Sequence, residues 1–352
     1  MAGYRQRLEQ DLDRWIGASL VPAENRAAIL ADVGESRRLD AATTLAAVGA
    51  VFLGIAIIAF VAANWDAIPR IARFVLVLAV FLSLCGGAAW AARRERPGLR
   101  NGLLALAALV YAAAIGLTGQ IFDIAGSPPA ALHGAGLAAG LLALAGRSSG
   151  AAMAGLVLLG LGDISDGPFR EAAEPPWLIF GAPLGVALAW KWRSAPLAHV
   201  AGLGLVVGAL LALMRLGPPT DAGLLLTAAA FAAAAAAVRW KRDAAEAVAG
   251  ALFGWCVLGA LGFFVMAGFE GGAFEGLPHR IVWLALSAGL LALARADQHG
   301  AAAGLAIVSL IGAVCAILFD LGLGLMSAAG VFLVSALAAL IAGWLMRRRA
   351  AA

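Results

Sequence analysis

The feature that most constrains the fold is a series of long apolar stretches that begins at Thr43 and continues almost to the C-terminus. Most are close to the length of roughly 20 residues that a helix needs to cross a bilayer. Apolar residues make up 63% of the chain and charged residues only 13%, a balance that a soluble core cannot absorb. We therefore predict an all-α, polytopic transmembrane helical bundle of about twelve spans. The predicted spans lie near residues 43–63, 70–92, 102–122, 129–146, 149–164, 177–192, 197–215, 222–240, 246–268, 279–295, 300–319 and 326–346.

Two neighbouring stretches leave the number of spans open. The fifth, 149–164, is short for a membrane span, and the fourth carries His133. If this pair forms a re-entrant hairpin that enters and leaves by the same side, the number of spans falls to ten. The sidedness of the remaining spans is the same in both cases.

Basic residues predict the orientation, because lysines and arginines of short loops are retained in the cytoplasm. With these spans, only five of the 25 lysines and arginines fall on the side opposite the N-terminus. Those five are Arg70, Arg73, Arg170, Arg215 and Arg280. The sequence therefore predicts a multi-pass protein of a bacterial inner (plasma) membrane with both termini in the cytoplasm.

The chain divides into three regions by composition. Residues 1–40 carry an apolar stripe at helical spacing, interrupted at Pro22, and predict a cytoplasmic amphipathic helical pair whose second helix starts at that proline. Two short helices cannot bury a core alone, so we expect them to dock on the membrane domain or on a cytoplasmic partner. Residues 43–346 form the transmembrane helical domain, and 347–352 form a basic cytoplasmic tail.

Partners are predicted from the small residues and the charge. Glycines four residues apart recur along the spans, which allows close helix contact within the bundle or in a homo-oligomer. The net charge of +4 comes mainly from loops beside spans, so it indicates membrane topology and the lipid bilayer as partner, with no nucleic acid. Cys85, Cys256 and Cys315 lie in apolar stretches without ligands at metal-binding spacing. We expect no disulfide, metal or cofactor.

Three pieces of the sequence resemble a known family. They are the stretch from Val48 through Asn64-Trp65-Asp66-Ala67-Ile68-Pro69 to Arg73, the N-terminal residues Leu12, Trp15, Gly17 and Pro22, and the segment Ile115–Phe122. Together they resemble the bacterial predicted membrane proteins grouped as domain of unknown function 2157, over roughly residues 8–165. The resemblance implies a polytopic inner-membrane protein and no particular chemistry.

One motif suggests an enzyme. Gly146-Arg147-Ser148-Ser149-Gly150 has the G-x-S-x-G pattern, and the segment around His199 is similar to the histidine helix of rhomboid-type intramembrane peptidases. The pattern activates a serine between a strand and a helix, whereas here it joins two apolar spans. We predict no enzymatic activity and keep an intramembrane peptidase as a remote alternative.

Carboxylates on the predicted outer side give the leading functional hypothesis. Several lie at the C-terminal ends of helices, where the helix dipole disfavours an anion and a compensating partner is needed. The candidate polar or transport site consists of Asn64, Asp66, Arg73, Gln120, Asp123, Asp163 and Asp320. Intramembrane carboxylates carry protons and cations in transporters, which predicts solute or proton/cation-coupled transport. The alternatives are pairing with the outer arginines and a non-transporting membrane scaffold or sensor.

Overall fold

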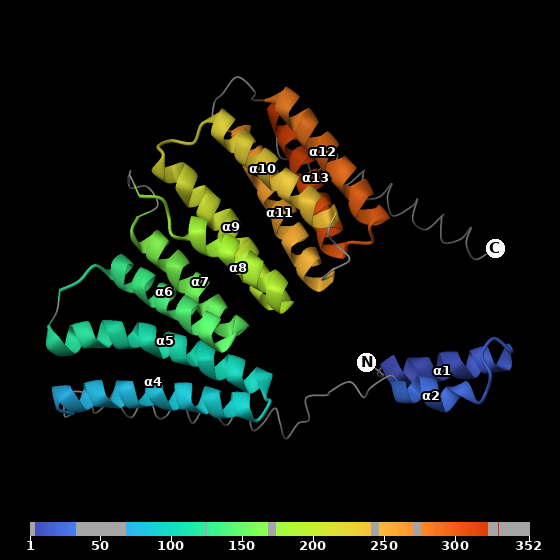
Figure 1. The fold of residues 1–352 in the computed structure, drawn as a ribbon. Helices are drawn as coiled ribbons and strands as arrows, with labels where there is room; N and C mark the ends of the chain where they lie inside the picture. The colour runs from blue at the N-terminus through green and yellow to red at the C-terminus, as the bar shows by residue number, and fades with distance from the viewer. Residues whose placement is uncertain are drawn as a thin grey trace. The chain divides into compact units, whose positions relative to one another are not determined.

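All regular secondary structure in the described part of the chain is α-helical, which confirms the predicted fold class (Figure 1). The computed structural model describes residues 4–32, 68–123, 125–167, 174–240, 246–269, 276–322 and 330. Contacts divide the chain into two compact units, Met1–Pro69 and Arg70–Ala352. Each unit is described by itself.

The first unit contains the helical pair α1 (Tyr4–Gly17) and α2 (Asn25–Asp32). Leu12 of α1 is fully buried, Leu30 of α2 is nearly so, and Arg26 Nε donates to Asp13 Oδ1 at 3.0 Å. The second helix begins three residues later than the predicted start at Pro22. The cause is a tight turn in which the Asn25 N–H bonds the Pro22 carbonyl at 3.0 Å.

The second unit has helices at ten of the twelve predicted span positions, counted over the described residues. They are α4 (Arg70–Arg93), α5 (Pro97–Phe122), α6 (Pro128–Gly146), α7 (Ser149–Ser165), α8 (Leu178–Trp192), α9 (Ala195–Arg215), α10 (Asp221–Trp240), α11 (Glu246–Ala267), α12 (Leu277–Ala296) and α13 (Gly300–Asp320). The predicted spans 43–63 and 326–346 and the tail 347–352 lie outside the described residues.

Eight of these described helices are long and apolar enough to cross a membrane, so the predicted number of about twelve spans is not confirmed. The shorter two are α7, with 17 residues, and α8, with 15. At 1.5 Å per residue α7 is about 26 Å long, slightly less than the roughly 30 Å of hydrocarbon. It packs against α5, α6, α8 and α9 and buries ten of its residues, so protein rather than lipid surrounds much of it.

The helices pair in chain order as antiparallel hairpins, and four of the connections have the same backbone geometry. In each, one residue takes a left-handed conformation with φ between 46° and 53°, and the next residue donates to the carbonyl five positions earlier at 2.9 to 3.0 Å. That is the Schellman arrangement, which ends a helix abruptly. The left-handed residues are Glu95, Arg147, Arg193 and Gln298, and the accepting carbonyls belong to Ala91, Ala143, Ala189 and Ala294.

The residue after the left-handed one often starts the next helix. Ser148, Ser194 and His299 each accept, through the side chain, the backbone N–H three residues further on. Such N-caps satisfy donors that a helix start leaves unpaired. A connection of two or three residues can only join antiparallel neighbours, so each of these turns fixes one hairpin.

The hairpins follow one another across the unit from α4–α5 to α12–α13 (Figure 1). Their second helices touch in sequence, α5 with α7, α7 with α9, α9 with α11 and α11 with α13. Gly136 and Gly155 allow the close approach of α6 and α7, because a Cβ on Gly155 would lie 3.0 Å from the Gly136 carbonyl oxygen. This stacking of helix pairs resembles that of α-solenoids.

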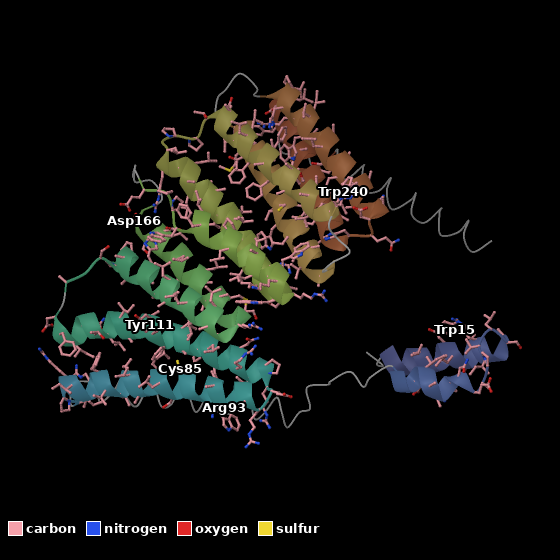
Figure 2. All side chains as sticks on the ribbon, viewed as in Figure 1. Trp15, Cys85, Arg93, Tyr111, Asp166 and Trp240 are labelled. Carbon is pink, nitrogen blue, oxygen red and sulfur yellow. The ribbon has the colours of Figure 1, made fainter. Side chains whose placement is uncertain are left out.

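The alternation of direction creates two ends of the unit. We call the end with the four tight connections the turn end, and the end where first helices begin and second helices finish the open end. Figure 2 marks them with Arg93 at the turn end and Asp166 at the open end. The open end carries the candidate site.

Candidate functional site

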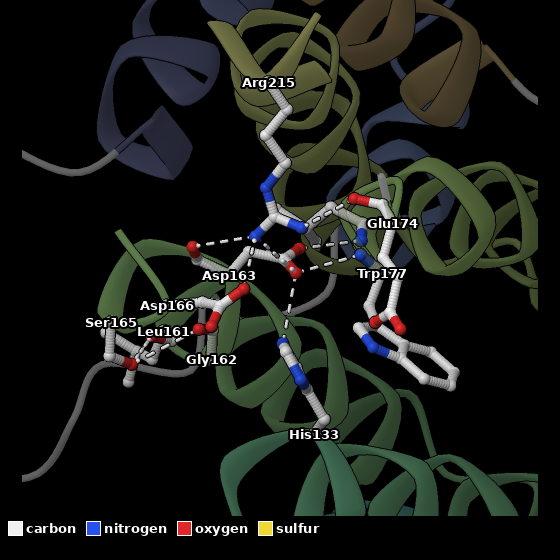
Figure 3. Close-up of polar contacts among 10 residues, drawn as sticks. His133, Leu161, Gly162, Asp163, Ser165, Asp166, Glu174, Trp177 and Arg215 are labelled. Atoms are coloured by element: carbon white, nitrogen blue, oxygen red, sulfur yellow. Dashed lines mark hydrogen bonds and ion pairs between the residues drawn. The ribbon is translucent and has the colours of Figure 1, made fainter. Parts of the chain in front are cut away.

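A buried cluster around Asp163 lies at the open end, where α7 finishes (Figure 3). The Asp163 side chain is fully buried. Its Oδ1 accepts from the Trp177 backbone N–H at 2.9 Å and from His133 Nε2 at 3.1 Å, and its Oδ2 accepts from the Leu178 backbone N–H at 2.9 Å. The carboxylate therefore caps the N-terminus of α8 from a neighbouring helix, where a negative charge is favoured.

Arg215, at the end of α9, supplies the compensating charge. Its side chain is only 5% exposed, and Nη2 lies 3.9 Å from Asp163 Oδ1 and 3.4 Å from Asp166 Oδ2. The guanidinium also donates to the backbone carbonyls of Glu174, at 3.1 Å, and Asp163, at 3.3 Å. Two carboxylates and two carbonyls thus hold one buried cation, and the cluster joins α6, α7, α8 and α9.

A glycine makes room for the histidine of this cluster. A Cβ on Gly162 would lie 2.3 Å from His133 Cδ2, so only a glycine allows the imidazole to lie against this face of α7. The His133 ring also lies beside Trp177, with 5.7 Å between ring centroids. Gly162 therefore leaves the space in which the imidazole reaches Asp163.

A second buried cluster occupies the open end of the last hairpin. Arg280, 4% exposed in its side chain, places Nε 3.3 Å from Asp320 Oδ2 at the end of α13. Its Nη1 donates to His279 Nδ1 at 3.2 Å, and His279 Nε2 donates to the Phe264 carbonyl at 2.9 Å. The guanidinium lies 3.9 Å from the Phe269 ring centroid, a cation–π distance.

The first hairpin has an exposed pair at the same end. Arg70 Nη2 lies 3.3 Å from Asp123 Oδ2, with 66% and 74% of the two side chains exposed. Asp123 follows α5 in a left-handed conformation, and its N–H bonds the Gly119 carbonyl. Three hairpins, α4–α5, α6–α7 and α12–α13, thus place an aspartate of the second helix against a basic or imidazole side chain of the first.

The residues of the predicted site therefore do not form a single site. Asp123, Asp163 and Asp320 lie in three different clusters, and α5 and α13 belong to hairpins at opposite edges of the unit (Figure 1). Arg73 lies in the first turn of α4. Asn64 and Asp66 lie outside the described residues.

Two apolar grooves open between the helices. One, of about 1120 Å³, lies between α4, α5 and α6 and includes Gln120 and Asp123 in its lining. The other, of about 1150 Å³, lies between α10, α11 and α12. Its lining is apolar except at the turn end, where Arg239 Nε donates to Asp297 Oδ2 at 2.6 Å. Within the described lining, charged side chains occur at the ends of the grooves and not at mid-depth.

The serine of the G-x-S-x-G pattern has a structural position. Ser148 is fully buried and caps α7 by accepting the Ala151 N–H at 3.2 Å. His199 Nδ1 accepts from Trp255 Nε1 at 3.1 Å. Among the residues that the structure describes, no group of three or more histidine, cysteine, aspartate or glutamate side chains could hold a metal ion.

Pairing of the outer carboxylates with the outer arginines was one of the alternatives from the sequence, and Asp163 with Arg215 and Asp320 with Arg280 agree with it. The individual pairs were not predicted, and neither was the contact of His133 with Asp163. One signal was present: His133, Arg215 and Arg280 are each ionisable residues close to the end of an apolar helix, and a charge there needs a partner when it is buried. Which aspartate each of them meets depends on the lateral order of the helices.

The comparisons with known proteins agree with this architecture. A family model described as a predicted membrane protein, DUF2157, matches residues 13–152. The match ends within the first turn of α7, so it takes in α4, α5 and α6. The chain matches none of the curated proteins and none of the solved structures with which it was compared.

Proposed function

We propose that this multi-pass membrane protein is a non-transporting scaffold or sensor, with a membrane unit of stacked helical hairpins. The observation that carries the proposal is the pairing of the aspartates. Asp123, Asp163 and Asp320 each lie against a basic side chain, and the last two are held among buried groups. Removing one partner of a buried ion pair destabilises a protein, so we infer that Asp163 and Asp320 hold helices together rather than exchange ions during transport.

The proposed orientation places a surface that could bind a partner protein in the cytoplasm. Eight basic residues of the second unit that take part in no ion pair among the described residues lie at the turn end, which we assign to the cytoplasmic side of a bacterial inner membrane. They are Arg93, Arg94, Arg96, Arg100, Arg147, Lys191, Arg193 and Arg295. The helical pair α1–α2 belongs on that side if the first predicted span crosses once. A scaffold or sensor would use this pair to contact a cytoplasmic partner.

A flux experiment tests the proposal. The purified protein is reconstituted into proteoliposomes, and proton, Na⁺ and K⁺ movements are measured under imposed gradients. We expect no flux above that of protein-free vesicles. The variant D163N should lower stability, because it disturbs a buried cluster.

Solute or cation-coupled transport is the second candidate, and one observation favours it. The groove between α4, α5 and α6 reaches Gln120 and the exposed Asp123, which an ion could approach from the open end. On this reading, wild-type protein moves protons or cations, and D123N abolishes the movement while leaving thermal stability unchanged. That result would replace the scaffold proposal.

A further inference from the structure

Five arginines gather where the first two hairpins meet the turn end. They are Arg93, Arg94, Arg96, Arg100 and Arg147, and we call them the arginine cluster. The first four lie within eight residues around the α4–α5 connection, and Arg147 lies in the α6–α7 connection. Figure 2 shows Arg93 at this end of α4. We propose that the arginine cluster binds the headgroup of an anionic phospholipid.

The cluster has no carboxylate partner within the described ranges. No ion pair among those residues includes any of its five members, whereas Arg70, Arg215 and Arg280 at the open end are all paired. At the turn end itself, Arg239 is paired with Asp297. The retention of basic residues in the cytoplasm accounts for arginines at this end. It does not account for four arginines within eight residues whose one intervening carboxylate, Glu95, forms no ion pair with them in the described part of the chain.

One contact ties the cluster across two hairpins. Arg100, in the first turn of α5, donates through Nη2 to the Arg147 carbonyl at 3.3 Å. The Nε of Arg100 and the Oδ1 of the adjacent Asn101 are buried and have no hydrogen-bond partner in the described part of the chain. Buried polar atoms are usually satisfied by protein, water or ligand. Both atoms are covered by protein, so they show unused hydrogen-bonding capacity at this contact and do not by themselves place a ligand there.

The side chains around Trp90 suit a phosphate group. The guanidinium carbons of Arg94 and Arg96 each lie 5.9 Å from the centroid of the Trp90 ring, so both cations are near the same exposed indole. Guanidinium groups bind phosphate oxygens in pairs of hydrogen bonds, and a tryptophan at the end of a span is typical of the headgroup level. Basic pockets between helices at this level are known to bind anionic lipid headgroups.

The neighbouring surface favours a lipid over a soluble anion. Along α4, whose buried residues are Ala88 and Ala91, the side chains of Val75 and Leu82 are 54% and 56% exposed, and Trp90 is 49% exposed. An apolar helix face thus leads directly to the cationic group. A lipid with acyl chains and an anionic headgroup can contact both the apolar face of α4 and the arginine cluster, whereas inorganic phosphate can contact only the arginine cluster.

The test measures lipid binding by the full-length protein in uncharged detergent. A fluorescent phosphatidylglycerol is titrated against the wild type and the variant R93Q/R94Q/R96Q, with phosphatidylcholine as the reference lipid. Each basic residue near a membrane surface contributes about 1 kcal/mol to the attraction of anionic lipid, so three should together change the affinity by about 100-fold. We expect the wild type to bind phosphatidylglycerol more tightly than phosphatidylcholine, and we expect the variant to lose this difference.

Two further variants serve as controls. One tests whether a loss of binding comes from lost charge or from poor folding, and the other tests whether the position of the charges matters. R93K/R94K/R96K keeps the charges and should retain most of the preference, even if the glutamine variant folds poorly. The matched control K191Q/R193Q/R295Q removes three charges from the turn end outside the arginine cluster and should bind phosphatidylglycerol like the wild type. In the wild type, added salt should weaken phosphatidylglycerol binding more than phosphatidylcholine binding.

Several outcomes would overturn the proposal. They are equal binding of both lipids by the wild type, an equally large loss in the control variant, and full competition by inorganic phosphate alone. The last result would assign the cluster to a soluble anion. A wild-type preference for phosphatidylglycerol that does not respond to salt would also count against it.

Discussion

Replacing Asp163 with asparagine tests how the middle hairpins are held together. The substitution keeps the size of the side chain and removes its charge. Both carboxylate oxygens accept a backbone N–H of α8, so an asparagine NH₂ group must face a donor in either orientation. One buried donor is then left unsatisfied, which costs about 1 to 3 kcal/mol.

The change also removes a carboxylate from Arg215. Breaking a buried ion pair costs about 3 to 5 kcal/mol when the remaining charge has no other partner. Arg215 keeps Asp166 at 3.4 Å and two backbone carbonyls, so this cost should fall below that range. We expect Asp163→Asn to lower the free energy of unfolding by about 3 to 5 kcal/mol in total.

The measurement is reversible unfolding of the purified protein in mixed micelles of increasing SDS content. Asp123→Asn is the matched control, because it makes the same change at the end of another second helix. Its partner Arg70 and the Asp123 side chain are 66% and 74% exposed, so the control should cost no more than about 1 kcal/mol. Equal stability of Asp163→Asn and the wild type, or an equal loss in the control, would refute the reasoning.

Two other predictions concern the second buried cluster and the topology. A Cβ at Gly268 would lie 2.2 Å from Nδ1 of the fully buried His279, so Gly268→Ala should lower the free energy of unfolding by about 1 to 3 kcal/mol. Gly262→Ala should not lower the free energy of unfolding, because the space around an added Cβ is open. Equal losses of stability in the two variants would contradict this prediction. In a background without the native cysteines, a cysteine at Gly126 should react with an impermeant maleimide in intact cells and one at Gly98 should not. Labelling at Gly98 before lysis would reverse the proposed orientation.

The positions of the helices could be predicted closely because the length of an apolar stretch decides them. The span predicted at 300–319 is α13, Gly300–Asp320, and the span predicted at 197–215 is α9, Ala195–Arg215. The largest difference is at α5, which begins at Pro97 rather than near residue 102. Hydropathy excludes the polar residues Arg100 and Asn101, whereas the helix itself begins at Pro97, a residue that suits the first turn of a helix.

The arrangement of the site could not be predicted in the same way. Gln120, Asp123 and Asp320 were grouped because they end helices in similar surroundings of the sequence. Hydropathy gives the depth of a residue in the membrane but not the lateral order of the helices. Asp123 and Asp320 belong to separate hairpins, and each aspartate meets the cation of its own hairpin.

The repeated connections have a consequence for synthesis. Four of the five hairpins in the second unit are closed by a turn of two or three residues, and the two helices of every hairpin contact each other more extensively than other helices. Contacts between neighbouring segments form early, since little chain entropy is lost in closing short loops. A hairpin can therefore assemble as soon as its second helix leaves the ribosome, before the next pair is made. The membrane unit would then assemble by addition of successive helix pairs, and α4–α5 would already be formed while α12–α13 is still being translated.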